Sequence, residues 1–166
     1  GIYKPTSGII NLNFEKKLTS REFKPHKMVQ YGVVRTFQNI RLFKEMTVIE
    51  NVLMGYHNNI NYGVLPSIFR LNSFYNGEKS AYDEALKLLE VFDLSNKSMV
   101  LAKHLPYGEQ RKLEIARALA SRPKLLLLDE PAAGMNPYET KELTKLIRWI
   151  KDEFNLTIIL IEHDMS

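Results

Sequence analysis

Residues 125–128 are four consecutive leucines, and Asp129 and Glu130 follow them directly. An unbroken apolar run cannot alternate between core and solvent, so it predicts a strand covered on both faces, as in a parallel sheet flanked by helices. Ligands of such sheets bind beyond the carboxyl ends of the strands. There an Asp can hold Mg²⁺, and a neighbouring Glu can deprotonate a water molecule. A core strand that runs into a charged turn is the simpler alternative.

A second strand of this kind follows after one crossover. Residues 157–161 are apolar up to the polar sequence Glu-His-Asp at residues 162–164. Between the two strands, Asn136 and Pro137 predict a helix start. The apolar face of that helix consists of Leu143, Leu146, Ile147, Ile150 and Phe154. Strand, helix and strand form a βαβ unit, in which parallel strands bring both polar ends to one edge of the sheet.

The first third of the chain predicts two further strands and a helix. Residues 7–13 read as a short strand after a turn, and residues 33–37 as a second strand. Thr47 and Glu50 have the spacing of a capping box, which predicts a helix that continues to about Tyr56.

The middle of the chain predicts a connection and two helices. Residues 57–77 have no clear period and are expected to form a connection with at most one short helical piece. Residues 78–92 show helical spacing of apolar residues. Leu113, Ala116 and Ala120 form the stripe of a second helix that ends before Pro123. We therefore expect an α/β fold with a parallel sheet flanked by helices.

The composition excludes several classes of protein. Of the 166 residues, 45% are hydrophobic and 25% charged, as in an ordinary globular domain. No apolar run approaches the roughly 18 residues of a membrane-spanning helix. The net charge of +4 comes from basic residues scattered among acids, which argues against a nucleic-acid groove. Without cysteine the chain forms no disulfide.

Four short segments follow one another in a characteristic order, at residues 35–38 (Arg-Thr-Phe-Gln), 105–111 (Leu-Pro-Tyr-Gly-Glu-Gln-Arg), 125–131 and 161–164. This order resembles the ATP-binding cassette ATPases, the motor subunits of ABC transporters. The likeness is strongest to the ATP-binding subunits of bacterial branched-chain amino acid importers, and it rests on residues 36–43, 46–51 and 129–137.

The resemblance implies a role for each segment. Gln38 matches the glutamine that contacts Mg²⁺ and the attacking water, and Asp129 matches the aspartate that holds Mg²⁺. Glu130 matches the catalytic base, and His163 the histidine that contacts the γ-phosphate of ATP. A single His after a strand is more often structural, so the role of His163 depends on the paired strand ends. Residues 133–136 match the loop through which two cassettes contact each other.

Residues 105–109 align with the Leu-Ser-Gly-Gly-Gln signature of the family, which binds the nucleotide. Gly108 allows close approach of the backbone to phosphate, and the following helix points its first N–H groups at the anion. Pro106 replaces the serine, Tyr107 the first glycine and Glu109 the glutamine. Tyr107 is familiar in the branched-chain importer branch, whereas Glu109 places a negative charge near the phosphates unless its surroundings compensate.

The phosphate-binding pattern Gly-x-x-x-x-Gly-Lys-Ser/Thr is not present in these residues. Gly-Glu-Lys-Ser at residues 77–80 imitates only its end. In the family this loop precedes a segment like residues 1–8, so we expect a P-loop NTPase-like core that is truncated at both ends. We expect residues 1–38 and 122–166 to form the catalytic core and about 39–121 a helical subdomain. The 166 residues alone are expected to lack ATPase activity.

The resemblance implies a transport ATPase that binds ATP and Mg²⁺ and drives the uptake of amino acids, with branched-chain amino acids as the favoured class. Its implied partners are a second ATPase subunit and transmembrane permease subunits, the latter through about Gln38 to Tyr56. The implied location is peripheral, at the cytoplasmic face of the membrane. Two alternatives stay open: an ABC ATPase of DNA repair or translation without a membrane partner, and a catalytically inert interaction module.

Overall fold

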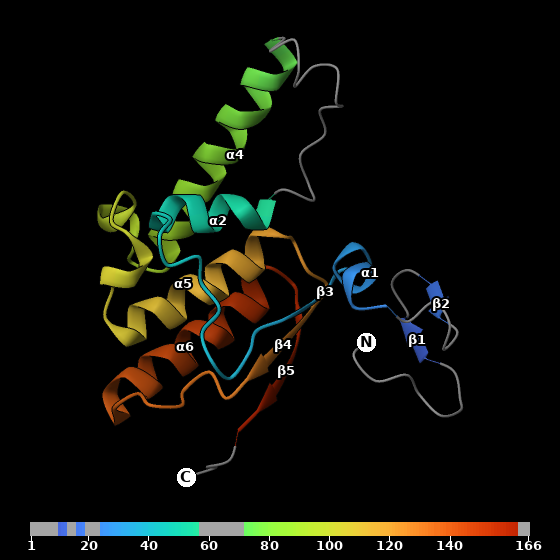
Figure 1. The fold of residues 1–166 in the computed structure, drawn as a ribbon. Coiled ribbons are helices and arrows are strands. Elements are labelled where there is room, and N and C mark those ends of the chain that lie inside the picture. The colour runs from blue at the N-terminus through green and yellow to red at the C-terminus, as the bar shows by residue number, and fades with distance from the viewer. Residues whose placement is uncertain (1–9, 13–15, 19–23, 57–71, 163–166) are drawn as a thin grey trace.

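The computed structural model describes residues 10–12, 16–18, 24–56 and 72–162. Its centre is a sheet of three parallel strands in the order β3 (Val33–Arg35), β4 (Leu125–Asp129) and β5 (Thr157–Ile161). Val33 pairs with Leu125 and Leu125 with Thr157, so the three strands run in register. The parallel βαβ unit predicted from the sequence is confirmed, and Figure 1 shows β4 and β5 side by side.

The longer helices, α2 (Val48–Tyr56), α4 (Asn72–Val91), α5 (Tyr107–Ala120) and α6 (Pro137–Glu153), lie on one side of this sheet, and the short helix α1 (Pro25–Gln30) lies on the other side, beside β3 (Figure 1). α5 and α6 lie over the sheet, and α2 and α4 pack against α5. Two short 3₁₀ turns, η2 (Ser95–Lys97) and η3 (Ala102–His104), connect α4 to α5. Gly55 allows α2 to approach α5 closely, because a Cβ there would collide with the carbonyl oxygen of Arg117.

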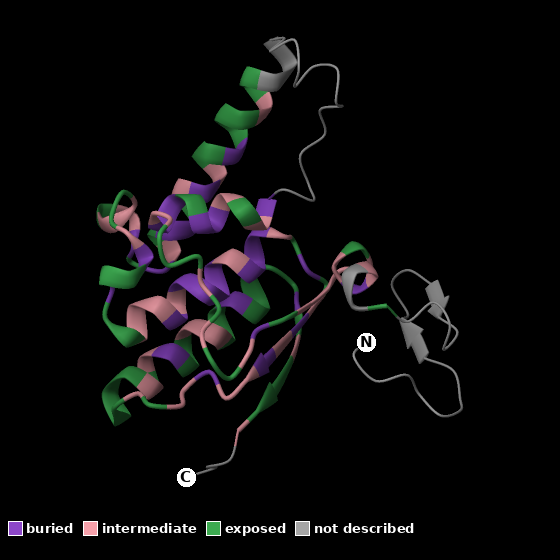
Figure 2. Ribbon diagram, viewed as in Figure 1, coloured by how far each residue is buried: buried purple, intermediate pink, exposed green. Residues whose placement is uncertain are grey.

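The core lies between the sheet and these helices, as the purple segments of Figure 2 show. Leu126 and Leu128 of β4 are buried in it, but Leu125 and Leu127 on the other face are only half-buried. The expectation that both faces of this strand are equally covered was therefore wrong for the described part of the chain. The physical reason is that α5 and α6 cover one face of the sheet only.

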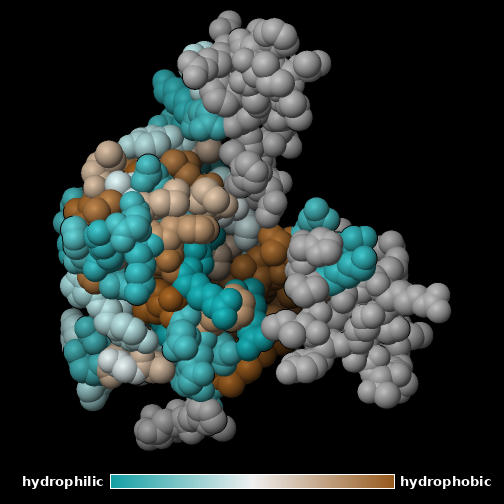
Figure 3. Space-filling view, viewed as in Figure 1, coloured by the Kyte–Doolittle hydropathy of each residue, from teal (hydrophilic) through white to brown (hydrophobic). Residues whose placement is uncertain are grey.

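The burial of β5 is also lower than its apolar sequence predicts. Ile159, Leu160 and Ile161 are each about half exposed, and Figure 3 shows a brown hydrophobic surface where this strand ends. Phe154, expected on the buried face of α6, is also exposed, whereas Leu143 and Ile150 of the same face are buried. Among the described residues, β5 is an edge strand that pairs only with β4.

Helix ends follow the predicted caps where the sequence contains them. Thr47 and Glu50 form the expected capping box of α2, with the Thr47 N–H donating to Glu50 Oε2 at 2.7 Å. Asn136 and Glu139 form a reciprocal capping box at α6. The helix expected at residues 78–92 begins earlier, at Asn72, and residues 57–71 of the expected connection lie outside the described residues.

Three small elements differ from the expectation. The strand expected at residues 7–13 appears as β1 (Ile10–Leu12), which pairs with an unpredicted antiparallel strand, β2 (Lys16–Leu18). A short helix, α1 (Pro25–Gln30), precedes β3 and was also not predicted. The strand expected over residues 33–37 ends at Arg35. No described helix is both long and apolar enough to cross a membrane.

Candidate functional site

The carboxyl ends of β3 and β4 bring two predicted site residues into contact. Gln38 lies three residues beyond β3, and Glu130 lies directly after β4. The side-chain amide of Gln38 donates from Nε2 to Oε2 of Glu130 at 2.9 Å. This contact places an amide and a carboxylate at the sheet edge where the sequence predicted them.

Asp129, the last residue of β4, is paired with Arg35, the last residue of β3. Arg35 Nη2 lies 2.6 Å from Asp129 Oδ2, and the Asp129 side chain is 18% exposed. From the sequence, Asp129 was assigned to a metal together with Gln38 and was given no protein partner. The pairing was missed because it depends on the register of two strands that are far apart in sequence, although Arg35 belongs to the same short segment as Gln38.

The backbone at Glu130 is in the left-handed region, with φ of 45°. Its N–H donates to the carbonyl oxygen of Ile161 at 2.9 Å, which ties the turn to the end of β5. A non-glycine residue in this conformation costs about 1–3 kcal/mol, and such residues gather at functional sites. The turn thus directs the Glu130 side chain toward Gln38 at an energetic cost.

The end of β5 also contributes to this edge. Glu162 Oε1 accepts a hydrogen bond from the backbone N–H of Ala132 at 3.4 Å. This contact holds the loop after Glu130 against the end of β5. His163, the second predicted catalytic residue, lies outside the described residues.

The second group of predicted residues lies at the start of α5. Pro106 precedes the helix, Tyr107 is its first residue and is 45% exposed, and Gly108 follows. Glu109, whose charge was expected to need compensation, is neutralised by Lys97. The Lys97 ammonium lies 2.6 and 2.7 Å from the two Glu109 oxygens. Lys97 belongs to η2, and no local pattern in the sequence predicted this pair.

The start of α5 also touches the loop of residues 133–136. The position of a Cβ on Gly134, which has φ of 78°, lies 3.4 Å from the Tyr107 ring. A Cβ on Gly108 would lie 3.3 Å from Glu139 Oε1 in the first turn of α6. Two segments that the resemblance connects with nucleotide and partner contact are therefore neighbours in the structure.

Arg111 connects this helix to the segment that carries Gln38. Its side chain is fully buried, and it donates to the backbone carbonyl oxygens of Phe37 and Gln38. Arg111 and Glu114, which pair at helical spacing, had no role in the sequence-based prediction. The spacing of an Arg and a Glu three residues apart on one helix is a sequence signal for their ion pair, but only the structure shows that the pair is buried.

The predicted metal ligands are oxygen donors of the kind that Mg²⁺ prefers. The candidates are the carboxylate of Asp129 and the amide oxygen of Gln38, which follow adjacent strands. Within the described ranges, no group of three or more His, Asp or Glu side chains that could hold a metal ion is present, either here or elsewhere. The donor set fits an ion that takes few protein ligands and is completed by a phosphate-bearing molecule.

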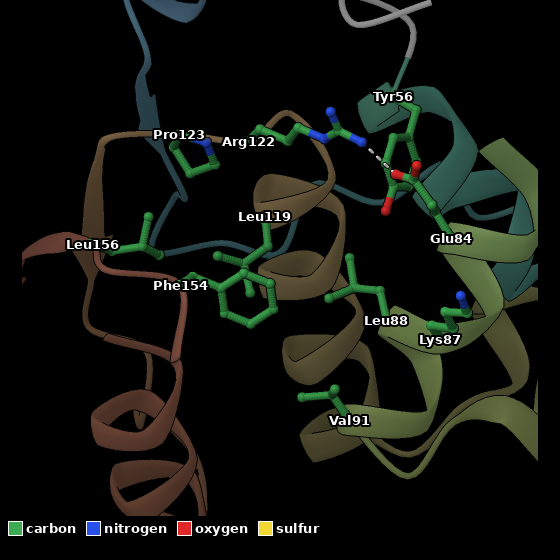
Figure 4. Close-up of a pocket in the computed structure, with 10 residues that line it drawn as sticks. All are labelled: Tyr56, Glu84, Lys87, Leu88, Val91, Leu119, Arg122, Pro123, Phe154 and Leu156. Atoms are coloured by element: carbon green, nitrogen blue, oxygen red, sulfur yellow. Dashed lines mark hydrogen bonds and ion pairs between the residues drawn. The ribbon is translucent and has the colours of Figure 1, made fainter. Parts of the chain in front are cut away.

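The described residues form two hollows, one away from the strand ends and one beside the end of β3. One, of about 500 Å³, lies between α4, α5 and the end of α6 (Figure 4). Arg122 and Glu84 form an ion pair of 2.6 Å at its rim, beside Tyr56, and burial raises the pKa of Tyr56. The other, of about 650 Å³, lies beside β3 and α2. It is lined by Arg35, Arg41, Arg117, Thr36, Phe37, Leu42, Phe43 and others.

Comparison with known proteins places these features in a family. The family described as ABC transporter matches residues 1–133. The branched-chain amino acid transport ATP-binding proteins BraF of Pseudomonas aeruginosa and LivG of Escherichia coli are each 46% identical over all 166 residues. The chain spans 64% of the length of these relatives.

A solved structure supports the same relationship at the level of the fold. The ADP conformation of an ATP-binding cassette of an ABC transporter superposes with a TM-score of 0.71 at 33% identity. The match covers 91% of this chain and 57% of that protein. The α/β class and the cassette-like architecture expected from the sequence are confirmed.

Proposed function

The chain belongs to the ABC transporter family, and from this premise we propose that the protein carrying it binds and hydrolyses ATP as the motor subunit of an amino acid importer. The contact between Gln38 and Glu130 carries the proposal, because it sets a carboxylate and an amide side by side at the sheet edge. Relatives named for branched-chain amino acid transport favour that class of substrate.

In the proposed reaction, Glu130 acts as a general base. It takes a proton from a water molecule as the water oxygen attacks the γ-phosphorus of ATP, and the bond to the bridging oxygen breaks to leave ADP and phosphate. Gln38 orients Glu130 and the water through its amide, which already lies 2.9 Å from the carboxylate. We propose that His163 stabilises charge on the transferred phosphoryl group.

Asp129 and Gln38 are proposed to hold Mg²⁺ at this edge. When bound, the ion neutralises charge on the β- and γ-phosphates. The Arg35 guanidinium lies 2.6 Å from the Asp129 carboxylate and is half exposed. A bound ion would therefore compete with Arg35 for this carboxylate.

The start of α5 is proposed to bind the nucleotide of a second ATPase subunit. Tyr107 is exposed there, and Gly108 allows the backbone N–H groups of the first turn to face an anion. Glu109 does not oppose this role, because Lys97 neutralises it. Two such subunits would close over two ATP molecules. The loop of residues 133–136 would then lie beside the contact between the two subunits.

The hollow beside β3 and α2 is proposed to receive the transmembrane permease, as the segment from Gln38 to Tyr56 borders it. We therefore propose that the protein lies at the cytoplasmic face of the membrane. We also propose that residues 1–38 and 122–166 form a catalytic core and that about residues 39–121 form a helical subdomain. The segment that carries Gln38 joins these two parts.

Affinity purification of the protein that carries this chain tests the proposal. We expect a polytopic membrane protein to co-purify, and ATP hydrolysis to respond to an amino acid delivered to the reconstituted complex. Purification without any membrane partner, with full ATPase activity, would favour a soluble ABC ATPase instead. Absence of ATP binding by the purified protein would favour an inert interaction module.

A further inference from the structure

The segment that carries Gln38 is fastened to α5 by one buried side chain. Arg111 is 0% exposed, and its guanidinium donates from Nη1 to the Phe37 carbonyl oxygen at 2.8 Å and from Nη2 to the Gln38 carbonyl oxygen at 2.6 Å. A planar guanidinium can hold two neighbouring carbonyls at once, which a lysine ammonium cannot do with the same geometry.

Glu114 completes this arrangement from the next turn of α5. It is 2% exposed, and its Oε2 accepts from Arg111 Nη1 at 2.8 Å. Its other oxygen accepts from the backbone N–H of Arg41 at 3.0 Å. One buried ion pair thus holds the backbone at residues 37, 38 and 41, while the Gln38 side chain extends in the other direction to Glu130.

The same guanidinium also reaches the exposed start of α5. Arg111 Nη2 lies 3.3 Å from the hydroxyl of Tyr107, the first residue of the helix. Tyr107, Arg111 and Glu114 occupy successive turns of one face. Because Arg111 bonds to the backbone of Gln38, a displacement of α5 is transmitted to that backbone by hydrogen bonds as well as by packing contacts.

We propose that Arg111 is a positioning residue, which with Glu114 clamps the Gln38 segment to α5 and so sets the contact between Gln38 and Glu130. The inference rests on the proposed ATPase function. It adds a physical connection between the start of α5 and Glu130, the proposed general base. Arg111 reaches neither Glu130 nor any reacting atom and acts only through Gln38.

A double variant, Arg111→Met with Glu114→Gln, tests the clamp in the protein that carries this chain. Removing Arg111 alone would leave a buried carboxylate unpaired and risk unfolding. The paired change removes both charges, and the glutamine keeps an oxygen for the Arg41 N–H. Arg122→Gln, which removes an exposed ion pair just after α5, is the matched control and is expected to retain parental turnover.

We expect the double variant to lower kcat for ATP hydrolysis about tenfold, with KM for ATP unchanged within about twofold. In a Gln38→Ala background the same change should lower kcat by less than about twofold, because Arg111 acts through Gln38. An equal loss in both backgrounds would overturn the proposal.

Hydrogen exchange gives a readout that does not depend on ATP. The backbone amides of residues 36–42 should exchange faster in the double variant, while those in the second half of α5 stay protected. Unchanged exchange over residues 36–42 would contradict the clamp. Parental turnover of a Glu130→Gln variant would instead contradict the proposed function, so the two failures are distinguishable.

Discussion

Gln38 donates a hydrogen bond of 2.9 Å to Glu130, a residue 92 positions later in the chain. The contact joins the segments that follow two adjacent parallel strands, and the left-handed backbone at Glu130 helps to create it. Neither residue is unusual alone. Together they give a carboxylate with a fixed hydrogen-bond donor at the sheet edge, where a water molecule can be oriented for attack.

Replacing Gln38 by Glu should abolish this arrangement. The substitution exchanges an amide donor for a second carboxylate within hydrogen-bonding distance of Glu130, and two like charges so close repel each other. We expect kcat for ATP hydrolysis to fall at least about tenfold, measured by phosphate release at saturating ATP. The neighbouring Asn39→Asp change adds the same charge on an exposed side chain and should have little effect. Equal losses for both variants would exclude a specific role for the Gln38 amide.

Replacing Arg35 by Met should lower the Mg²⁺ concentration that gives half-maximal ATPase activity. The guanidinium and the ion compete for the Asp129 carboxylate, and the pair is partly exposed. Partly exposed ion pairs contribute at most about 1 kcal/mol of interaction free energy. The Mg²⁺ concentration for half-maximal activity should therefore change by no more than about fivefold. A magnesium titration of initial rates measures it. A higher magnesium requirement would show that Arg35 supports the ion and does not compete with it.

Replacing Lys97 by Met should weaken the binding of ATP. Without its ammonium, the Glu109 carboxylate at the start of α5 is no longer neutralised, and it repels the proposed phosphate ligand. We expect the apparent Kd for ATP to rise about two- to fivefold, as for a partly exposed pair. Adding Glu109→Gln should restore the affinity. Lys103→Met, which breaks an exposed pair with Glu45, is the control.

Glu50 should give α2 a pH-dependent stability. Hydrogen bonds from the Thr47 backbone and side chain lower the pKa of Glu50 below its ordinary value of 4.5. The folded state therefore binds this proton less readily than the unfolded state, and the stabilisation is present above pH 4.5 and lost as the pH falls through the lower folded pKa.

Chemical denaturation at about pH 7 and about pH 3 measures this effect. Glu50→Gln keeps an acceptor for the Thr47 N–H but removes the titration, so the stability difference between the two conditions should shrink. Thr47→Ala, which removes only the hydroxyl contact, should shrink it in part. A difference unchanged by Glu50→Gln would contradict the assignment.

The local parts of the fold were predictable from the sequence. The boundaries of β5 and the two capping boxes follow from apolar runs and from polar residues at fixed spacing, and these signals act over a few residues. Although the position of β3 beside β4 was not predicted, the parallel pairing of β4 with β5 follows from the βαβ unit. By contrast, Ile10–Leu12 pairs with Lys16–Leu18, which has no apolar pattern, and α4 extends back to Asn72 through residues of low helical propensity.

The site was predictable in its members but not in their connections. Glu130 was recognised from its position at the end of a strand, whereas Gln38 was recognised only through the family resemblance, and their contact follows from strand pairing. The partners Arg35, Lys97 and Arg111 were missed because each acts on a residue brought near by tertiary packing. An Arg on a helix is usually exposed, and only the packed structure shows that Arg111 is buried beneath the Gln38 backbone.

The most direct measurement compares ATP binding and ATP turnover in the Glu130→Gln variant of the protein that carries this chain. Glutamine keeps the size of the side chain but cannot accept the proton from water. Turnover should therefore fall by about 10²- to 10⁴-fold while the Kd for ATP stays within about threefold of the parent. Turnover equal to that of the parent would contradict the role of Glu130 as the base.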